Sequence, residues 1–220
     1  MQEIKALIEK EIRLEWRQKY ALNGMLLYII STVFVCYMNF KLKVDIIEPI
    51  TWNTLFWIIL LFSAVNSITK SFTQEGAGRQ LYYYTLASPQ GIIISKIIYN
   101  TLLMLVLSLL GFLIYIIMMG NPIQNIPMYL VCLVLGAIGF ATTLTMVAGI
   151  ASKAENTSTL MAILSFPIIL PMLMMIIKLS KSAMDGLGWE TSYDEISILL
   201  AIDAIVLSIS YLLFPYLWRS

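Results

Sequence analysis

Six long runs of apolar residues alternate with short polar stretches along this chain. Each run is long enough to cross roughly 30 Å of hydrocarbon as a helix that rises about 1.5 Å per residue. The runs predict an all-α membrane protein with six transmembrane helices, at 21–38, 51–67, 92–119, 128–151, 159–177 and 196–217. The third run is the longest, which fits a tilted helix or a helix that begins at the membrane surface.

Residues 1–20 are charged, but their apolar side chains recur at helical spacing. One broad face of the expected helix carries Ile4, Leu7, Ile8, Ile12, Leu14 and Trp16. The charged side chains that lie largely outside this face are Glu3, Glu9, Lys10, Arg13 and Arg17. The pattern predicts an amphipathic helix over 1–20 in the membrane interface, with Trp16 and Tyr20 at headgroup depth. A solvated helix packed on a partner would show the same pattern.

The composition agrees with a membrane protein, since 60% of the 220 residues are hydrophobic and a soluble domain cannot bury that fraction. The net charge of +1 gives no footprint for nucleic acid. The chain has no histidine, which excludes histidine bases, histidine metal ligands and histidine-ligated haem. Cys36 and Cys132 both fall inside predicted spans, and we expect buried free thiols, with a disulfide as the alternative.

Basic residues are distributed unevenly between the two sides that six spans would create. Ten are assigned to the loops and termini of one side: Lys5, Lys10, Arg13, Arg17, Lys19, Lys70, Arg79, Lys96, Lys153 and Arg219. Four are assigned to the other side: Lys41, Lys43, Lys178 and Lys181. Because cytoplasmic loops are enriched in Lys and Arg, both termini are expected in the cytoplasm.

The longest polar interruption separates the second and third runs and includes Gly76 and Gly78, which interrupt regular structure. Residues 79–87 can form a short helix at the membrane surface. Ser88 and Pro89 then resemble an N-cap and a first helical residue. We interpret 71–91 as a cytoplasmic coupling segment. The residues expected to contact a partner ATPase are Glu75, Arg79, Tyr82, Tyr83 and Tyr84. A plain interfacial connector is the alternative, since tyrosine favours headgroup depth.

On the outer side, 179–195 is expected to be an extracytoplasmic segment that contains a short amphipathic helix. It carries the acidic and aromatic residues Asp185, Trp189, Glu190, Tyr193, Asp194 and Glu195.

A few small or helix-breaking residues stand out inside the spans. The fourth span carries small residues at helical spacing, Gly136, Gly139, Thr143 and Gly149, which favour close helix packing. The fifth carries Pro167 and Pro171, which share a face, remove backbone donors and predict a kink.

Asp203 is the one acidic residue well inside a predicted span. Its insertion costs about 3 kcal/mol, which the surrounding Ile and Leu residues can offset. The two interpretations are a functional site and a polar contact with another helix. We favour the contact, because no second charge within the spans pairs with it.

Several kinds of chemistry have no motif here. The sequence has no G-x-x-x-x-G-K-[ST] phosphate loop, no H-E-x-x-H and no G-x-S-x-G. An intramembrane enzyme is therefore disfavoured. The remaining layout is that of a transport permease whose energy comes from a separate nucleotide-binding subunit.

Four stretches, in this order and spacing, resemble the CcmB family over the full length of the chain. They are EKEIRLEWRQKYAL, EGAGRQLYYYTLASPQGIIISK, LGAIGFATTLTMVAGIASKAENTSTLMAILSF and FPIILPMLM. The triple tyrosine departs from a usually more leucine-rich stretch. Asp203 matches no hallmark of the family.

The resemblance implies an ABC-2-type permease architecture and a role in cytochrome c maturation. It implies a CcmA-like ATPase partner that binds ATP, CcmC-like and CcmD-like membrane subunits, and a CcmE-like haem chaperone whose haem-loaded form is released on the outer face of the bacterial inner membrane. Methionine or tyrosine could still hold haem iron, but a firm bis-histidine site cannot be built here. We expect no cofactor to bind this chain directly, haem being handled by the complex. A mechanical role is therefore favoured over a haem channel.

Three competing interpretations stay open at this point. The first is an ABC-2-type permease that exports a lipid, a glycan or a drug. The second is a membrane scaffold without transport function. The third is an intramembrane enzyme centred on Asp203.

Overall fold

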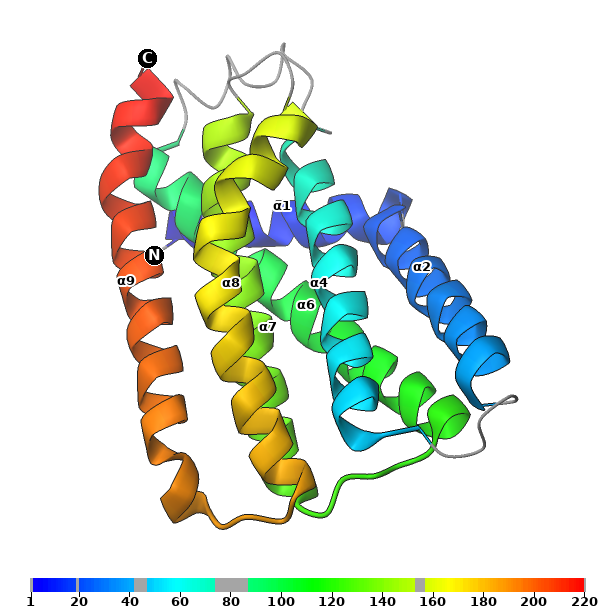
Figure 1. The fold of residues 1–220 in the computed structure, drawn as a ribbon. Helices are drawn as coiled ribbons and strands as arrows, with labels where there is room; N and C mark the ends of the chain where they lie inside the picture. The colour runs from blue at the N-terminus through cyan, green and yellow to red at the C-terminus, as the bar shows by residue number, and fades with distance from the viewer. Residues whose placement is uncertain (1, 19, 42–46, 74–86, 153–156, 220) are drawn as a thin grey trace.

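All regular structure in the described residues is helical. The structure, a computed structural model, describes residues 2–18, 20–41, 47–73, 87–152 and 157–219. Its helices are α1 (Gln2–Gln18), α2 (Tyr20–Cys36), α4 (Pro49–Thr73), α6 (Pro89–Met119), α7 (Ile126–Ala151), α8 (Thr157–Met184) and α9 (Tyr193–Arg219), drawn in Figure 1. A π-helical turn at Tyr37–Lys41 follows α2, and a 3-10 turn at Trp189–Ser192 precedes α9.

Six helices in the described ranges are long and apolar enough to cross a membrane. They run over Leu22–Phe40, Pro49–Thr69, Pro89–Met119, Ile126–Ala151, Thr159–Met184 and Trp189–Tyr216. The prediction of six spans is therefore confirmed, as is that of a separate N-terminal helix, which is α1.

The prediction of a short amphipathic helix within 179–195 is wrong. Instead α8 continues to Met184, a one-turn 3-10 helix follows, and α9 begins at Tyr193. The extension of α8 is possible because its two lysines face outward and are paired. Lys178 forms an ion pair with Glu195 at 2.7 Å, and Lys181 forms one with Asp185 at 3.2 Å. Charged side chains in these positions therefore do not end the helix.

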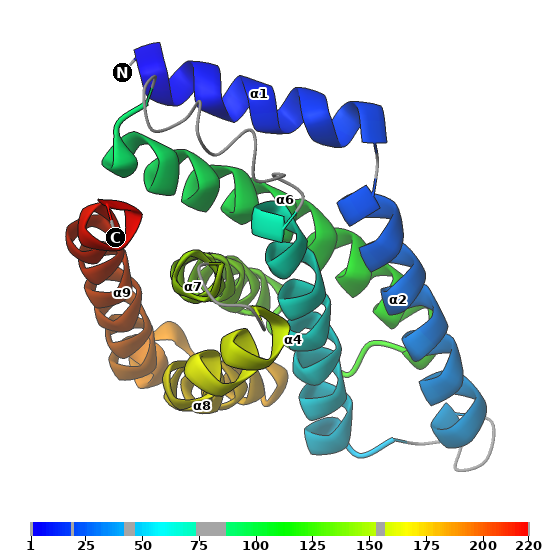
Figure 2. The ribbon, with the colours of Figure 1, turned by 90° about the horizontal axis from the view of Figure 1, so that it is seen from above.

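α7 lies at the centre of the bundle, with α4, α6, α8 and α9 around it (Figure 2). Its span is 78% buried, against 17% for the span of α9. Small residues permit this crowding. A Cβ added to Gly136 would lie 2.7 Å from the ring of Trp57, and one added to Gly139 would collide with the sulfur of Met172. Gly149 is buried near the end of the same helix.

An aromatic cluster that was not evident from the sequence joins α4, α6 and α7. Its members are Trp52, Phe56, Trp57, Phe112, Tyr115, Tyr129 and Phe140. The rings stand 4.6 to 6.4 Å apart between centroids, mostly tilted or edge to face. Such pairs contribute about 0.5–1.5 kcal/mol beyond the area that they bury.

Hydrogen bonds connect the aromatic cluster to α8. The Tyr129 hydroxyl donates to the Asn53 side chain at 3.1 Å. The Asn53 amide and the Trp57 indole N–H both donate to the Ser180 hydroxyl oxygen, at 2.8 Å and 3.0 Å. Ser180 in turn donates to the carbonyl of Ile176 at 2.7 Å. Because these polar groups are buried and partnered, the cluster specifies a single arrangement of four helices.

Both cysteines are buried free thiols, as expected. Cys36 ends α2, and Cys132 lies in α7, where its thiol donates to the Ile176 carbonyl at 3.4 Å.

We expect Ser180→Ala to destabilise the bundle, because the Trp57 N–H loses its acceptor and the Asn53 amide keeps only a 3.3 Å bond to the Ile177 carbonyl. The expected cost is about 1–3 kcal/mol. Thermal unfolding of the purified protein measures it. Ser182→Ala is the matched control, since the half-buried Ser182 hydroxyl bonds only its own helix, at Lys178. Equal unfolding temperatures for the two variants would contradict this account.

Candidate functional site: the contact between α1 and α6

α1 and the first turns of α6 run side by side in the same direction (Figure 2). Three acidic residues of α1 reach partners that are 85, 85 and 84 residues further along: Glu3 to Ser88, Glu11 to Lys96 and Glu15 to Tyr99. The nearly constant offset shows that the two helices are in parallel register. Positions 3, 7, 11 and 15 recur every four residues, so they form one stripe of α1.

The first contact is at the N-terminus of α6. Pro89 is the first residue of that helix, and the Ser88 hydroxyl caps it by accepting the Gly91 N–H at 3.1 Å. The predicted cap is therefore confirmed. The Glu3 carboxylate accepts the Ser88 N–H at 2.6 Å and its hydroxyl at 3.0 Å. Gly91 permits this approach, because a Cβ there would lie 2.8 Å from the Glu3 oxygen.

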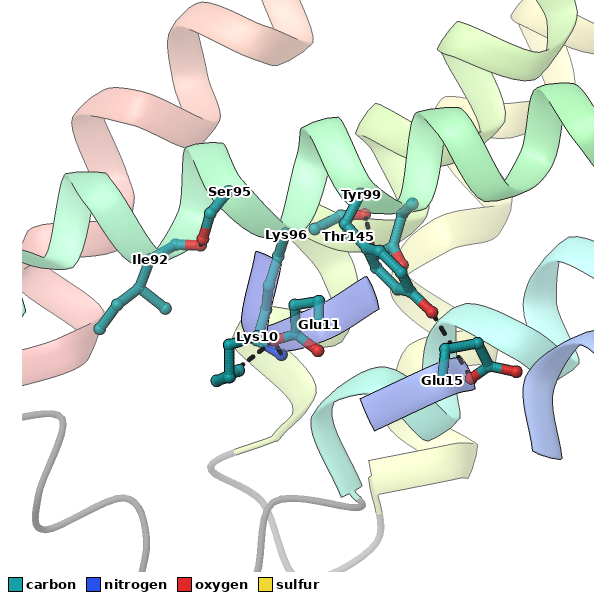
Figure 3. A network of polar contacts seen from close by, with 9 residues as sticks. Lys10, Glu11, Glu15, Ile92, Ser95, Lys96, Tyr99 and Thr145 are labelled. Atoms are coloured by element: carbon teal, nitrogen blue, oxygen red, sulfur yellow. Dashed lines mark hydrogen bonds and ion pairs between the residues drawn. The ribbon is translucent and has the colours of Figure 1, made fainter. Parts of the chain in front are cut away.

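The second contact is a buried ion pair. The Lys96 ammonium lies 3.2 Å from the Glu11 carboxylate, which Lys10 also contacts at 2.9 Å (Figure 3). Lys96 is 2% exposed and Glu11 is 8% exposed. The assignment of Lys96 to a loop is wrong, because the residue lies inside α6. It is covered by α1, which supplies its counter-charge.

The third contact ties α1 to two helices at once. One oxygen of the Glu15 carboxylate accepts the backbone N–H of Leu22, in the first turn of α2, at 2.8 Å. The other lies 3.5 Å from the Tyr99 hydroxyl of α6 (Figure 3). The face of α1 turned toward the bundle thus carries carboxylates, whereas Ile12 and Trp16 are 46% and 78% exposed.

These contacts can fix α1 to α6 mechanically. Burial removes water that would otherwise compete for each carboxylate, so separating the Glu11–Lys96 pair would leave a charge without solvation. The start of α6 and α1 should therefore move together. Ser88 and the first residues of α6 belong to the segment 71–91, so the described end of that segment is part of this contact.

Most of the other functional residues predicted from the sequence do not lie at the contact between α1 and α6. Glu75, Arg79, Tyr82, Tyr83 and Tyr84 lie outside the described residues. Pro167 and Pro171 lie within α8 and are exposed, and the kink stays a prediction.

Asp203 lies in α9, 8% exposed, against Gly139 of α7. Neither of its carboxylate oxygens has a hydrogen-bond partner in the described part of the chain. The polar contact that we favoured from the sequence is therefore not found among these residues. Asp203 meets α7 by close packing only.

Six helices that are long and apolar enough to cross a membrane, with a charged helix fixed along one of them, define a multi-pass membrane protein. The family model described as CcmB protein matches residues 2–217, nearly the whole chain. The chain belongs to the CcmB family. It is a membrane subunit of the CcmAB haem export ABC transporter of cytochrome c maturation, whose ATPase activity resides in its partner CcmA. A search of curated proteins finds no match.

We expect Lys96→Met to loosen α1, because the buried Glu11 carboxylate then loses the ammonium of α6 and keeps only its contact with Lys10 on its own helix. Breaking a buried pair in this way costs about 3–5 kcal/mol. Tryptic cleavage after Lys10, Arg13 and Arg17 reports the release of α1 from α6 and should accelerate.

Lys5→Met, at an exposed position of the same helix, is the control and should leave cleavage at those sites unchanged. The double variant Glu11→Leu/Lys96→Met removes both charges and should restore much of the protection. Cleavage of Lys96→Met at the control rate would show that the ion pair does not hold α1.

Proposed function

We propose that this chain passes an ATP-driven displacement of CcmA from the segment 71–91 into α6, and that this movement drives release of a haem-loaded chaperone on the opposite side of the membrane. The observation that carries the proposal is that α6 is fixed at both ends. Its first turns are bound to α1, and its last turns place Phe112 and Tyr115 in the aromatic cluster. The whole of α6 has 31 residues and is about 45 Å long, and these contacts lie near its two ends.

Displacement of the start of α6 should therefore be delivered to α4, α7 and α8 at its far end. Tyr115 donates a hydrogen bond to the Trp52 carbonyl at 2.9 Å, and Asn53 connects the same region to Ser180. Helices that are packed and hydrogen-bonded in this way shift as units between discrete arrangements.

The proposed orientation places both termini and 71–91 in the cytoplasm of a bacterial cell, in the inner membrane. It is supported by the excess of basic residues on that side and by the even number of spans in the described chain. CcmA would then meet the chain on the side of α1, and CcmE would meet the complex on the side of the aromatic cluster.

The further partners that we propose are CcmC and CcmD as membrane subunits and CcmE as the haem chaperone. Haem is the cargo of this complex. We propose that other subunits ligate it and that this chain binds no cofactor directly. The support is chemical, since a chain without histidine lacks the commonest protein ligand of haem iron.

The decisive variant replaces Tyr82, Tyr83 and Tyr84 together with serine. We expect reduced co-purification with CcmA or reduced ATP-dependent release of the chaperone, because the contact surface of the segment is removed. Pull-down from membranes and a chaperone-release assay measure the two effects. If both stayed unchanged, the segment would not be the coupling site.

Asp203→Asn tests whether the buried carboxyl has a chemical role. We expect full cytochrome c maturation, because Asp203 makes no hydrogen bond in the described structure that the amide would lose. Holocytochrome yield measures the outcome. Loss of maturation with normal membrane levels of the variant would revive an intramembrane site at this position.

A further inference from the structure

A pocket of about 360 Å³ opens where α1, α2 and α6 meet. Its lining is apolar apart from a few polar groups, and includes Trp16, Leu22, Tyr99, Leu102, Val106 and the carboxylate of Glu15. The pocket is therefore amphipathic. A negative charge stands at one end and aliphatic side chains stand along the rest.

Glu15 is a buried carboxylate, 9% exposed, without an ionic partner among the described residues. It accepts the Leu22 N–H at 2.8 Å and approaches the Tyr99 hydroxyl at 3.5 Å. A carboxylate has about four acceptor positions, so two donors leave it capacity for a further hydrogen bond. Glu11, one turn earlier on the same helix, contacts two lysines. The contrast indicates that Glu15 can accept a cation from outside the described chain.

The surroundings of the pocket face lipid. Trp16 is 78% exposed on α1, and an exposed tryptophan beside a span is typical of headgroup depth. Leu102 and Val106 are 49% and 48% exposed on α6. Val106 comes seven residues after Tyr99, so it lies about 10 Å further along the span. A ligand here would meet charge at the membrane surface and apolar side chains below it.

We propose that this pocket binds phosphatidylethanolamine, with the headgroup ammonium on Glu15 and an acyl chain along Leu102 and Val106. A primary ammonium supplies N–H donors for a charge-assisted hydrogen bond to the carboxylate. The Trp16 ring can add a cation–π contact, and Asn23, which also lines the pocket, offers an amide donor to the lipid phosphate. Phosphatidylcholine lacks the N–H donors, and phosphatidylglycerol would bring an anion to a carboxylate.

The proposal is tested on the detergent-purified complex with CcmA, by native mass spectrometry with added phosphatidylethanolamine, phosphatidylcholine or phosphatidylglycerol of matched chains. We expect the wild type to bind phosphatidylethanolamine at least about tenfold more tightly than phosphatidylcholine, which corresponds to ~1.4 kcal/mol. Equal binding of the two lipids would overturn the proposal.

Glu15→Gln removes the charge of Glu15 but keeps its hydrogen bond to α2, because the amide oxygen can still accept the Leu22 N–H. This variant should lose the preference for phosphatidylethanolamine. Glu9→Gln is the matched control, since Glu9 is an exposed carboxylate on the same helix that pairs with Arg13. It should keep the preference. A preference that survives Glu15→Gln would overturn the proposal.

Val106→Trp tests the apolar end of the pocket, which the larger side chain fills. Binding of phosphatidylethanolamine should weaken while thermal unfolding of the variant stays normal. Unchanged binding would place the acyl chain elsewhere and contradict the proposed site.

Lys19→Gln tests whether a lysine of this chain, rather than the lipid ammonium, pairs with Glu15. Lys19 follows Glu15 by four residues in the sequence. The preference for phosphatidylethanolamine should be the same in this variant as in the wild type. A preference that appeared only in Lys19→Gln would mean that this lysine neutralises Glu15, and the proposal would fall.

Discussion

The buried ion pair between Glu11 and Lys96 determines where α1 lies on the bundle. An ammonium that is 2% exposed inside a span is costly unless a counter-charge reaches it. α1 brings that counter-charge from outside the six spans. A shift of one turn along α6 would place Leu7 or Glu15 opposite Lys96 and would separate Glu3 from Ser88. The N-terminal helix is therefore not an accessory that rests on the membrane. It completes the electrostatics of a transmembrane helix and is fixed in register by doing so.

The two ends of α6 are held by different physics. At the α1 end, an ion pair and hydrogen bonds join residues that are 84 or 85 positions apart in the sequence, and they fix the direction and register of α1 along α6. At the other end, rings from α4, α6 and α7 interlock, and Ser180 of α8 accepts the two buried donors beside them. Both ends resist deformation, so α6 can shift as a unit. The spans of α2 and α9 are 22% and 17% buried, which leaves their surfaces to lipid or partner subunits.

The sequence was sufficient for the elements whose cause is local. Apolar runs predict transmembrane helices because backbone N–H and C=O groups in hydrocarbon must form hydrogen bonds within the chain. Ser88-Pro89 predicts the start of a helix because both residues act within its first turn. Contacts between distant residues were not predictable in this way. Nothing near Lys96 in the sequence indicates that its partner is Glu11, and Trp52 or Tyr129 look like any other apolar residue of a span. The end of α8 was placed too early because lysines that form outward-facing pairs resemble loop residues when they are read alone.

The order of Glu11 and Lys96 in the chain has a consequence for biogenesis. Glu11 leaves the ribosome 85 residues before Lys96, an interval of roughly 4–17 s at bacterial elongation rates. Two of the six apolar helices lie between these residues in the sequence. The carboxylate that neutralises Lys96 is thus synthesised before the lysine that needs it, and chain order alone makes the counter-charge available when the charged segment enters the membrane.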